Sequence, residues 1–348
     1  MKIFCISSTA HPNCIGGIET FERNLKNMFM KELKIFAFKT DKNKYFKVSD
    51  IFEIDKKELK FKILRKIFGL NIIMKNILNK VDYDICIINN PKKELNWIKK
   101  NSKKILVQHE CYDSYIKNFF ENDKKIVKKI KKKLDYFIFL SDYDKERFIK
   151  EIDFPREKSV VIRHTCEIEL LNNSKERNKE LIMICRLENK HKRIDLAINA
   201  MKKLKNYTLN IYGDGEDKQY LENLIKENNL KNVFLHGGTN QVKERLDENS
   251  IFIMTSDYEG YPITTIEAMR RGLPIILRNT FDSASDIIQN NGILLDKEWN
   301  EDEFIEAVNK VYNNYEYYSI NSIEKGKRYN FETIKKDWND LFNKLKKI

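Results

Sequence analysis

Two glutamates, Glu259 and Glu267, lie eight residues apart around a turn that follows the apolar run 251–255. In open α/β sheets, small molecules bind beyond the carboxyl ends of the strands, where the following helix offers unpaired N–H groups. Both carboxylates could therefore line one pocket, one facing a sugar and the other a diol. The simpler alternative is an ordinary strand, turn and helix with solvated glutamates, because a pair at this spacing arises easily by chance when 34% of the residues are charged.

The start of the predicted helix offers backbone amides as a further set of binding groups. Pro262 suits the first helical position, since its missing N–H would have no partner inside the helix. The amides of Ile263, Thr264 and Thr265 would then point into the loop and favour an anion there. We therefore expect Thr264 and Thr265 to contact a phosphate-bearing ligand.

Two cations follow another predicted strand, 180–185. Arg186 stands at its carboxyl end, and a guanidinium there can hold a diphosphate through two hydrogen bonds. Lys192, a few residues further on, can neutralise the remaining charge, and Lys190 is a rival for this role. An exposed basic loop without a ligand is the alternative.

Glycines occupy the turns after two predicted strands. Gly16 and Gly17 come after the strand 2–7 and open an amphipathic helix, and Gly213 comes after the strand 208–212. Because glycine has no Cβ, the backbone amides of such turns can approach a phosphate or a nucleotide. Each turn alone is a weak signal and is also typical of a loop without a ligand.

Together these motifs resemble those of a known enzyme family. The stretch 256–274 contains Ser-Asp-Tyr-Glu-Gly-Tyr-Pro, then Ile-Glu-Ala-Met, then Gly-Leu-Pro, while Gly16-Gly17-Ile18-Glu19 follows the first strand and Arg186-Leu187 precedes Lys192. The combination resembles the retaining nucleotide-sugar glycosyltransferases of the GT-B fold, in particular their large fourth family. The resemblance covers nearly the whole chain, strongly over 180–295 and loosely before it.

The resemblance implies roles for individual residues. Arg186 and Lys192 would contact the donor phosphates, and Glu267 would accept hydrogen bonds from both ribose hydroxyls. Glu259 would lie near the hydroxyls of the donor sugar. His109, at the end of a predicted strand, matches by position a family histidine that contacts the donor sugar. We therefore expect Glu259 and His109 to serve catalysis, and the glycine turns to border the donor.

The sequence departs from the family pattern at three places. Cys185 stands where the family has a glycine, one extra residue precedes Lys192, and Pro262 replaces a frequent glycine near the donor sugar. Because Pro262 removes one amide donor, the resemblance implies no particular sugar. We prefer Lys192 to Lys190 for the phosphate, because the next helix then starts at 194.

The elements that must position these residues alternate between strand-like runs and helical patterns, which is typical of doubly wound parallel sheets. At 348 residues, the chain is long enough for two domains. The resemblance implies two Rossmann-like α/β domains whose parallel sheets face each other across a cleft. We expect an acceptor-side domain at 1–165, a nucleotide-sugar-binding domain at 166–330 and, at 331–348, a helix that crosses back to the first domain.

The implied reaction moves a hexose or N-acetylhexosamine from a nucleotide sugar, UDP-linked, to a hydroxyl of a growing glycan or lipid-linked acceptor, with retention of configuration. Fixed cations and helix amides would stabilise the departing diphosphate, so no metal ion or other cofactor is expected. The pattern Asp142-Tyr143-Asp144 fits a metal motif, but the preceding Ser141 favours a capped helix start. The alternatives are a sugar-nucleotide epimerase or phosphorylase of the same fold, and a non-catalytic basic binding protein.

The net charge of +13 attracts polyanions and anionic membranes. No nucleic-acid motif accompanies this charge, so no specific nucleic acid is expected, and AT-rich codon usage is an alternative source of the lysines. Basic helical stretches at 56–80 and 124–134 carry apolar residues at helical spacing. Each could dock on the core of its domain or on an anionic membrane face.

The start of the chain and its apolar runs indicate where the protein resides. The first predicted strand begins directly after Met1-Lys2, which leaves no room for a signal peptide, and no apolar run is long enough to span a membrane. The six cysteines are scattered and suggest no disulfide framework. We expect a cytoplasmic protein that is peripheral on the inner face of the membrane.

Overall fold

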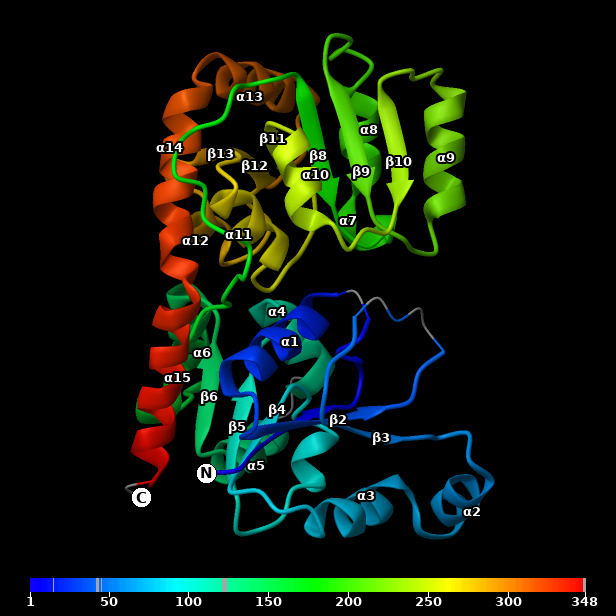
Figure 1. Ribbon diagram of the computed structural model, residues 1–348, viewed down its shortest axis with the longest axis vertical. Coiled ribbons are helices and arrows are strands. Elements are labelled where there is room, and N and C mark those ends of the chain that lie inside the picture. Colours follow the sequence, from blue (N-terminus) through cyan, green and yellow to red (C-terminus); the bar gives the residue numbers. More distant parts are fainter. Residues whose placement is uncertain (15, 42–43, 45, 121–123, 347–348) are drawn as a thin grey trace. The chain divides into compact units, whose positions relative to one another are not determined.

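The computed structural model describes residues 1–14, 16–41, 44, 46–120 and 124–346. The chain divides into two compact units (Figure 1): unit 1 comprises Met1–Thr165 with Ile334–Ile348, and unit 2 comprises Cys166–Thr333. Each unit is built on its own parallel sheet.

Unit 1 holds a seven-stranded sheet in the order β3-β2-β1-β4-β5-β6-β7, in which every neighbouring pair is parallel. The strand order reverses between β1 and β4, so the carboxyl ends of these two strands form the switch point where ligands bind in such sheets. The strands are β1 (Ile3–Ser7), β2 (Leu33–Phe38), β3 (Ile51–Ile54), β4 (Ile85–Ile88), β5 (Lys103–Val107), β6 (Tyr136–Phe139) and β7 (Ser159–Val161).

Helices cover both faces of this sheet, which explains why its central strands are apolar along their whole length: all residues of β1 and β4 are buried. The helices are α1 (Gly17–Phe29), α2 (Leu59–Phe68), α3 (Leu70–Asn79), α4 (Tyr112–Tyr115), α5 (Lys124–Lys133), α6 (Asp142–Ile152) and α15 (Phe331–Lys346), with short turns of helix at Glu94–Asn96, Ile116–Phe120 and Arg156–Lys158. Residues 347–348, the end of the predicted last helix, lie outside the described residues.

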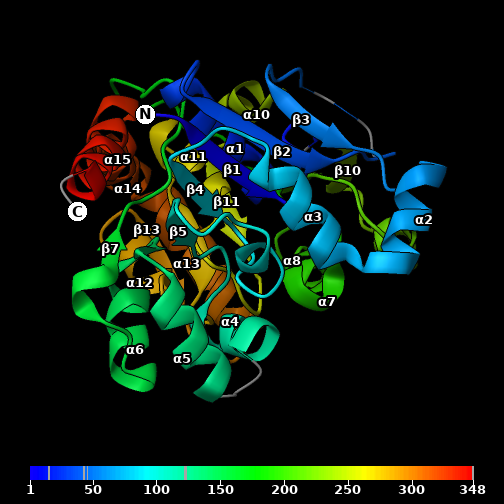
Figure 2. The same cartoon turned by 90° about the horizontal axis from the view of Figure 1, so that it is seen from below.

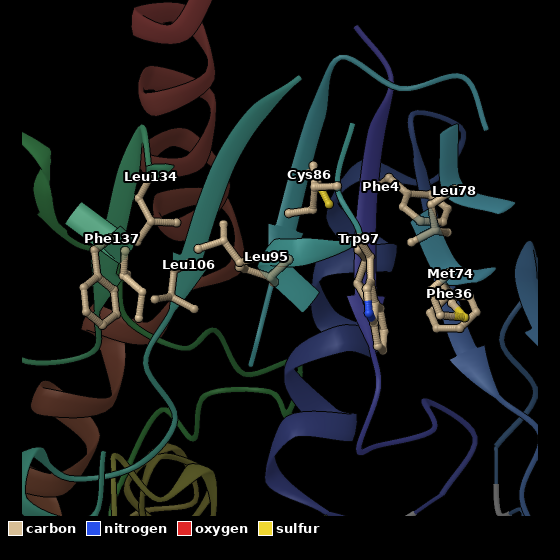
Figure 3. Close-up of a cluster of buried hydrophobic side chains, with 14 of the residues drawn as sticks. Phe4, Phe36, Met74, Leu78, Cys86, Leu95, Trp97, Leu106, Leu134 and Phe137 are labelled. Atoms are coloured by element: carbon tan, nitrogen blue, oxygen red, sulfur yellow. The ribbon is translucent and has the colours of Figure 1, made fainter. Parts of the chain in front are cut away.

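The core of unit 1 is rich in aromatic side chains (Figure 3). Trp97 is fully buried, packs edge-on against Phe38 with ring centroids 6.2 Å apart, and donates its indole N–H to Asn71 Oδ1 at 2.8 Å. The last helix packs on α1, where the rings of Phe29 and Phe342 lie 5.2 Å apart. Aromatic rings bury large apolar areas, so they contribute strongly to the stability of this unit.

Unit 2 holds a six-stranded parallel sheet in the order β10-β9-β8-β11-β12-β13, with its switch point between β8 and β11. The strands are β8 (Glu180–Ile184), β9 (Thr208–Tyr212), β10 (Val233–Gly237), β11 (Ile251–Met254), β12 (Ile275–Arg278) and β13 (Gly292–Leu295). The helices are α7 (Asn189–Lys192), α8 (Ile194–Ala200), α9 (Lys218–Glu227), α10 (Val242–Glu248), α11 (Ile263–Arg270), α12 (Ala284–Ile287), α13 (Glu301–Asn313) and α14 (Tyr315–Gly326), followed by a short turn at Lys327–Tyr329.

The predicted fold class, two doubly wound parallel α/β sheets, is confirmed. Two local features differ from the sequence prediction. The edge strand β3 has no predicted counterpart, and the helical stretch 56–80 is interrupted at Gly69, whose φ of 75° ends α2 and separates it from α3. None of the helices in the described part of the chain combines the length and apolar composition that crossing a bilayer requires.

Candidate functional site

The loop after β11 holds Glu259 in an ion pair. Lys192 Nζ lies 2.6 Å from Glu259 Oε1, and Ser256 donates its hydroxyl to the same oxygen at 2.6 Å. Only 12% of the Glu259 side chain and 22% of the Lys192 side chain are exposed, so the pair is screened from water. Burial acts to lower the pKa of Lys192, but the charge and hydrogen bond of Glu259 outweigh burial and raise that pKa.

Residues at the carboxyl end of β12 and just after it hold the loop that carries Glu259. Arg278 donates to the Thr255 carbonyl at 2.9 Å and to Asp257 Oδ1 at 2.6 Å, and Thr280 donates its hydroxyl to the Ser256 carbonyl at 2.7 Å. Bonds to consecutive residues leave the loop little freedom to rotate. The Glu259 carboxylate therefore has a defined position before any ligand arrives.

Lys192 is tied to the same loop through its backbone. Its carbonyl accepts the Thr255 hydroxyl at 3.0 Å, and the His191 carbonyl accepts the Asp257 N–H at 2.8 Å. The helix α8 begins at Ile194, as the sequence predicts. Lys190 is exposed and forms no ion pair with another described residue, so the two rival lysines differ plainly in their surroundings.

Arg186 lies directly after β8, at the switch point of unit 2. Its guanidinium is exposed and forms no hydrogen bond or ion pair within the described residues. It is close enough to Lys192 for their charges to repel, which acts to lower the pKa of Lys192. Two cations held within reach of each other, one of them without a protein partner in the described part of the chain, form a local positive field that suits a polyvalent anion.

The turn at Gly213 packs against the Arg186 loop. A Cβ at Gly213 would lie 1.8 Å from the Cys185 carbonyl oxygen, so no other residue fits without moving the backbone. Leu187 N–H donates to the Asp214 carbonyl at 3.0 Å and joins the two loops. Gly213 thus has a structural reason for its presence beside the role in donor binding that the sequence predicts.

The helix α11 begins at Ile263, and Pro262 precedes it as the N-cap residue. The prediction that Pro262 occupies the first helical position is therefore wrong. Thr265 is fully buried, and both its N–H, at 3.2 Å, and its hydroxyl, at 2.7 Å, donate to the Pro262 carbonyl. Among the described residues, the N–H groups of Ile263 and Thr264 have no acceptor. These two amides remain for a ligand, whereas Thr265 shapes the first turn.

Glu267 lies in the second turn of α11 and is partly buried. Burial raises the pKa of the Cys166 thiol to about 12, and the charge of Glu267 contributes to that rise. Glu267 therefore lies near Cys166, the first residue of unit 2. Its predicted bond to a ribose stays a prediction.

In unit 1, the Gly16–Gly17 turn carries a carboxylate of the chain itself. An added Cβ at Gly16 would lie 2.2 Å from Glu19 Oε2, and Glu19 is buried. A negative charge stabilises the start of α1, but it also repels a phosphate at the same place. A Cβ at Gly17 would meet nothing within 4 Å.

His109 follows β5 and takes part in a chain of hydrogen bonds. Its Nε2 lies 2.9 Å from Asn89 Oδ1, and Asn89 Nδ2 donates to Glu22 Oε1 at 2.9 Å. Because Asn89 presents its carbonyl oxygen, Nε2 of His109 carries the proton and Nδ1 carries a lone pair. Burial, and then His164, lower the pKa of His109 well below its ordinary value, so the ring is neutral.

Glu22 and Glu94 are two fully buried acids near the switch point of unit 1 that were not predicted from the sequence. Glu94 accepts the backbone N–H groups of Ser8, Asn89 and Asn90, each at 2.9 Å. Burial raises the pKa of Glu94 to about 7, although these hydrogen bonds act in the opposite direction. The available sequence signal was the pair Asn89-Asn90, which directly follows the apolar run 85–88.

No group of three or more metal-binding side chains was found among the described residues. The predicted cap is present, because Ser141 Oγ accepts the Asp144 N–H at 3.0 Å and α6 starts directly after Ser141. That the reaction needs no metal stays a prediction.

A cavity of about 610 Å³ in unit 2 includes none of the predicted site residues. Its polar groups bond to one another: Asn210 donates to Glu180 at 2.8 Å and to Asn249 at 2.9 Å, and the Tyr212 ring stacks on His236 with centroids 4.5 Å apart. These bonds leave few groups for a ligand, so the geometry favours the loops after β8 and β11 as the candidate site.

Residues 169–328, most of unit 2, match the family of glycosyl transferases group 1. Over this stretch, a little under half of its length, the chain is similar to that family. The matched stretch contains Arg186, Lys192, Glu259 and Glu267, the charged residues that the loops after β8 and β11 and the helix α11 carry.

Curated glycosyltransferases are matched by the chain over part of their length. The chain is 30% identical over 167 residues to the poly(ribitol-phosphate) alpha-N-acetylglucosaminyltransferase of Staphylococcus aureus (strain COL), which covers 44% of this chain and 33% of that protein. It is 25% identical over 193 residues to the O-antigen biosynthesis glycosyltransferase WbnH of Escherichia coli, covering 56% and 55%. The chain thus spans about a third of the first relative and about half of the second.

Solved structures extend the likeness to almost the whole chain. Sucrose-phosphate synthase from Thermosynechococcus elongatus superposes with a TM-score of 0.81 at 17% identity, covering 99% of this chain and 98% of that one. A mutant of S. aureus TarM in complex with Fondaparinux, alpha-GlcNAc-glycerol and UDP gives 0.66 at 26% identity, covering 78% and 59%. The GT-B fold predicted from the sequence is confirmed.

Proposed function

We propose that the protein transfers a hexose or N-acetylhexosamine from a UDP-linked donor to a hydroxyl of a growing glycan or lipid-linked acceptor. The observation that carries this proposal is the family match over residues 169–328, within which Arg186 and the Lys192–Glu259 pair lie at one end of a parallel sheet. In this proposal unit 2 binds the nucleotide sugar and unit 1 serves the acceptor.

The cations of unit 2 would stabilise the leaving group. Cleavage of a nucleotide-sugar bond leaves negative charge on the departing diphosphate, so fixed positive groups lower the barrier without a bound metal. Among the described residues, Arg186 has an exposed guanidinium free to bind phosphate through two hydrogen bonds, and Lys192 stands beside it. The amides of Ile263 and Thr264 would add two further donors.

Glu259 would orient the donor sugar. Held by Lys192 and Ser256, its carboxylate keeps the remaining lone pairs for sugar hydroxyls. Glu267 would accept both ribose hydroxyls, and His109 would accept a sugar hydroxyl at Nδ1. These three roles come from the family resemblance together with the hydrogen bonds described above.

The proposed reaction retains the anomeric configuration. The bond between the anomeric carbon and the diphosphate oxygen breaks, and its electron pair leaves with the nucleotide. The acceptor hydroxyl forms the new bond on the same face, and a phosphate oxygen takes its proton. UDP is proposed as the carrier because it occupies the TarM structure.

Thermal shift with UDP and a panel of UDP sugars tests the donor site, because a ligand that binds only the folded protein raises its Tm. We expect UDP to raise the Tm of the native chain and to have a much smaller effect on Glu267→Ala. Glu222→Ala is the matched control, since Glu222 is an exposed glutamate on α9. An unchanged UDP shift in Glu267→Ala would contradict the ribose contact, and no shift with any nucleotide sugar would contradict the proposed function.

A further inference from the structure

Five large apolar side chains of unit 1 are exposed within fourteen consecutive residues. Leu59, Ile63, Ile67, Phe68 and Ile72 are exposed by 71%, 50%, 64%, 53% and 54%. We name this group the α2–α3 patch. Single exposed apolar residues are normal, but five of them this close together in the chain indicate an interaction surface.

The patch faces away from the core of its unit. Leu59, Ile63 and Ile67 follow one another at four-residue spacing, so they form a stripe along one side of α2. Phe61, on the opposite side, is buried in the core cluster. The chain bends at Gly69, with the exposed Phe68 at the end of α2 before the bend and the exposed Ile72 in the first turn of α3 after it. Both views show α2 at the periphery of unit 1 (Figures 1 and 2).

Every charged residue of the two helices and their C-cap is basic. The exposed cations around the patch are Lys60, Lys62, Arg65, Lys66, Lys75 and Lys80. None of them forms an ion pair with a described residue, and 59–80 contains no aspartate or glutamate. In the helical arrangement, Lys60 lies on one side of the Leu59–Ile67 stripe, and Lys62 and Lys66 lie on the other.

We propose that the α2–α3 patch docks on the surface of an anionic lipid bilayer. Helices with an apolar stripe flanked by lysines lie in the plane of the interface, with the stripe among the acyl chains and the cations among the headgroups. The proposal goes beyond sugar transfer and gives the proposed transferase a membrane partner, so the two are measured by separate experiments.

The charge pattern distinguishes a bilayer from a second copy of this chain. A symmetric dimer through the patch would bring two sets of the same six cations together, with the exposed N-cap Glu58 as a single adjoining acid on each copy. Like charges in contact disfavour association. An anionic headgroup layer neutralises all six.

The same criteria exclude the second basic stretch predicted for the membrane. On α5, Ile130 and the following Leu134 are buried, and Ile126 and Val127 pack against the core cluster. The apolar side of α5 is thus already covered, and the helix turns only lysines outward. The docking surface narrows from the two predicted helices to α2 and α3.

Co-sedimentation of the full chain with vesicles tests the proposal. The vesicles are phosphatidylcholine with and without phosphatidylglycerol, and the native chain should bind only the anionic ones. The variant Ile63→Ser/Ile67→Ser should bind about tenfold more weakly, because it removes apolar insertion at exposed positions where folding is unaffected. The variant Lys62→Gln/Lys66→Gln should weaken binding similarly and make it less dependent on salt.

Two matched control variants distinguish binding through this patch from binding through the overall positive charge or through exposed apolar residues elsewhere. Lys128→Gln/Lys129→Gln removes two exposed lysines from α5, and Tyr317→Ser/Ile320→Ser removes two exposed apolar residues from α14. Both should bind vesicles as the native chain does. Absence of binding by the native chain, equal loss in a control, or unchanged binding of Ile63→Ser/Ile67→Ser would overturn the proposal.

The remaining outcomes are distinguished by two further measurements. If Ile63→Ser/Ile67→Ser turns a native dimer into a monomer in sedimentation velocity, a second copy covers the patch and the bilayer proposal is wrong. The Tm shift with UDP should be the same in all these variants. A vesicle-binding failure with an intact UDP shift therefore contradicts the membrane docking and leaves the proposed transfer standing.

Discussion

Lys192 and Lys190 are two positions apart in the chain, but Lys192 is largely buried in an ion pair with Glu259, whereas Lys190 is exposed. Lys192→Gln removes the cation beside Arg186 and leaves Glu259 with Ser256 as its remaining donor among the described residues. We expect its Kd for UDP to rise about tenfold or more, as for a lost charge-assisted bond to phosphate, while Lys190→Gln stays near the native value. Isothermal titration with UDP makes the comparison. A larger loss in Lys190→Gln would assign the phosphate to Lys190.

Glu94 predicts an unusual pH dependence of stability. Its folded pKa of about 7 lies above the ordinary 4.5, so the folded chain holds a proton that the unfolded chain has lost between these values. The contribution of Glu94 to the free energy of unfolding is therefore fully present below the unfolded pKa. It is lost as the pH rises through the folded pKa, and the total loss is about 3 kcal/mol.

The variant Glu94→Gln isolates this contribution, since glutamine resembles the protonated acid and does not titrate. Urea unfolding from about pH 5 to about pH 8 should show a less negative slope of the free energy of unfolding against pH in the variant than in the native chain. The comparison concerns the slope, because the amide also changes the bonds to Ser8, Asn89 and Asn90. Equal slopes would show that Glu94 is ionised throughout this range.

Single residues of the candidate site were predictable to different degrees. Arg186, Lys192, Glu259 and Glu267 were predicted because each stands at a fixed offset from the end of a strand or the start of a helix, and their roles stay predictions. Glu94 was not found, because it becomes a buried acceptor only when β1 and β4 lie side by side and turn three N–H groups toward it. Spacing along the chain carries no such information.

At the scale of elements, we expect alanine to destabilise the protein at one glycine turn and to have little effect at the other. In Gly213→Ala, the new Cβ meets the Cys185 carbonyl oxygen, so the loops after β8 and β9 must separate. We expect a loss of about 1–3 kcal/mol in the free energy of unfolding and weaker binding of UDP, because the Arg186 loop moves with it. Gly17→Ala adds a Cβ in open space and should change stability by less than about 1 kcal/mol. Chemical denaturation measures both, and equal effects would contradict the packing argument.

The elements themselves were predicted where burial leaves a plain pattern. Fully buried parallel strands such as β1 and β11 read as continuous apolar runs. The strand β3 was missed because it is a short edge strand, paired only with β2 in the described sheet, and Phe52 and Glu53 are exposed. The break at Gly69 was missed because the apolar spacing continues across it, and only the positive φ of Gly69 reveals two helices.

At the scale of the whole molecule, two similar sheets carry different ionisable residues at their switch points. Unit 1 has Glu22 and Glu94 buried near the ends of β1 and β4, whereas unit 2 has Arg186 and Lys192 after β8. A diphosphate is attracted to the fixed cations of unit 2, whereas the two acids of unit 1, whose pKa values are raised by burial, offer it no positive charge. This difference gives a physical reason to propose unit 2, and not unit 1, for the donor.

The complete reaction can be tested with a UDP sugar in the absence and presence of an acceptor. With a UDP sugar alone, a transferase should release UDP slowly, and an added glycan acceptor should raise the rate and yield one glycosylated product. Mass spectrometry identifies the product, and NMR of the new linkage should show the anomeric configuration of the donor. An altered sugar nucleotide without acceptor would indicate an epimerase, and a requirement for inorganic phosphate would indicate a phosphorylase. Binding to polyanions that falls steeply with salt, together with indifference to every nucleotide sugar, would leave only a basic binding protein.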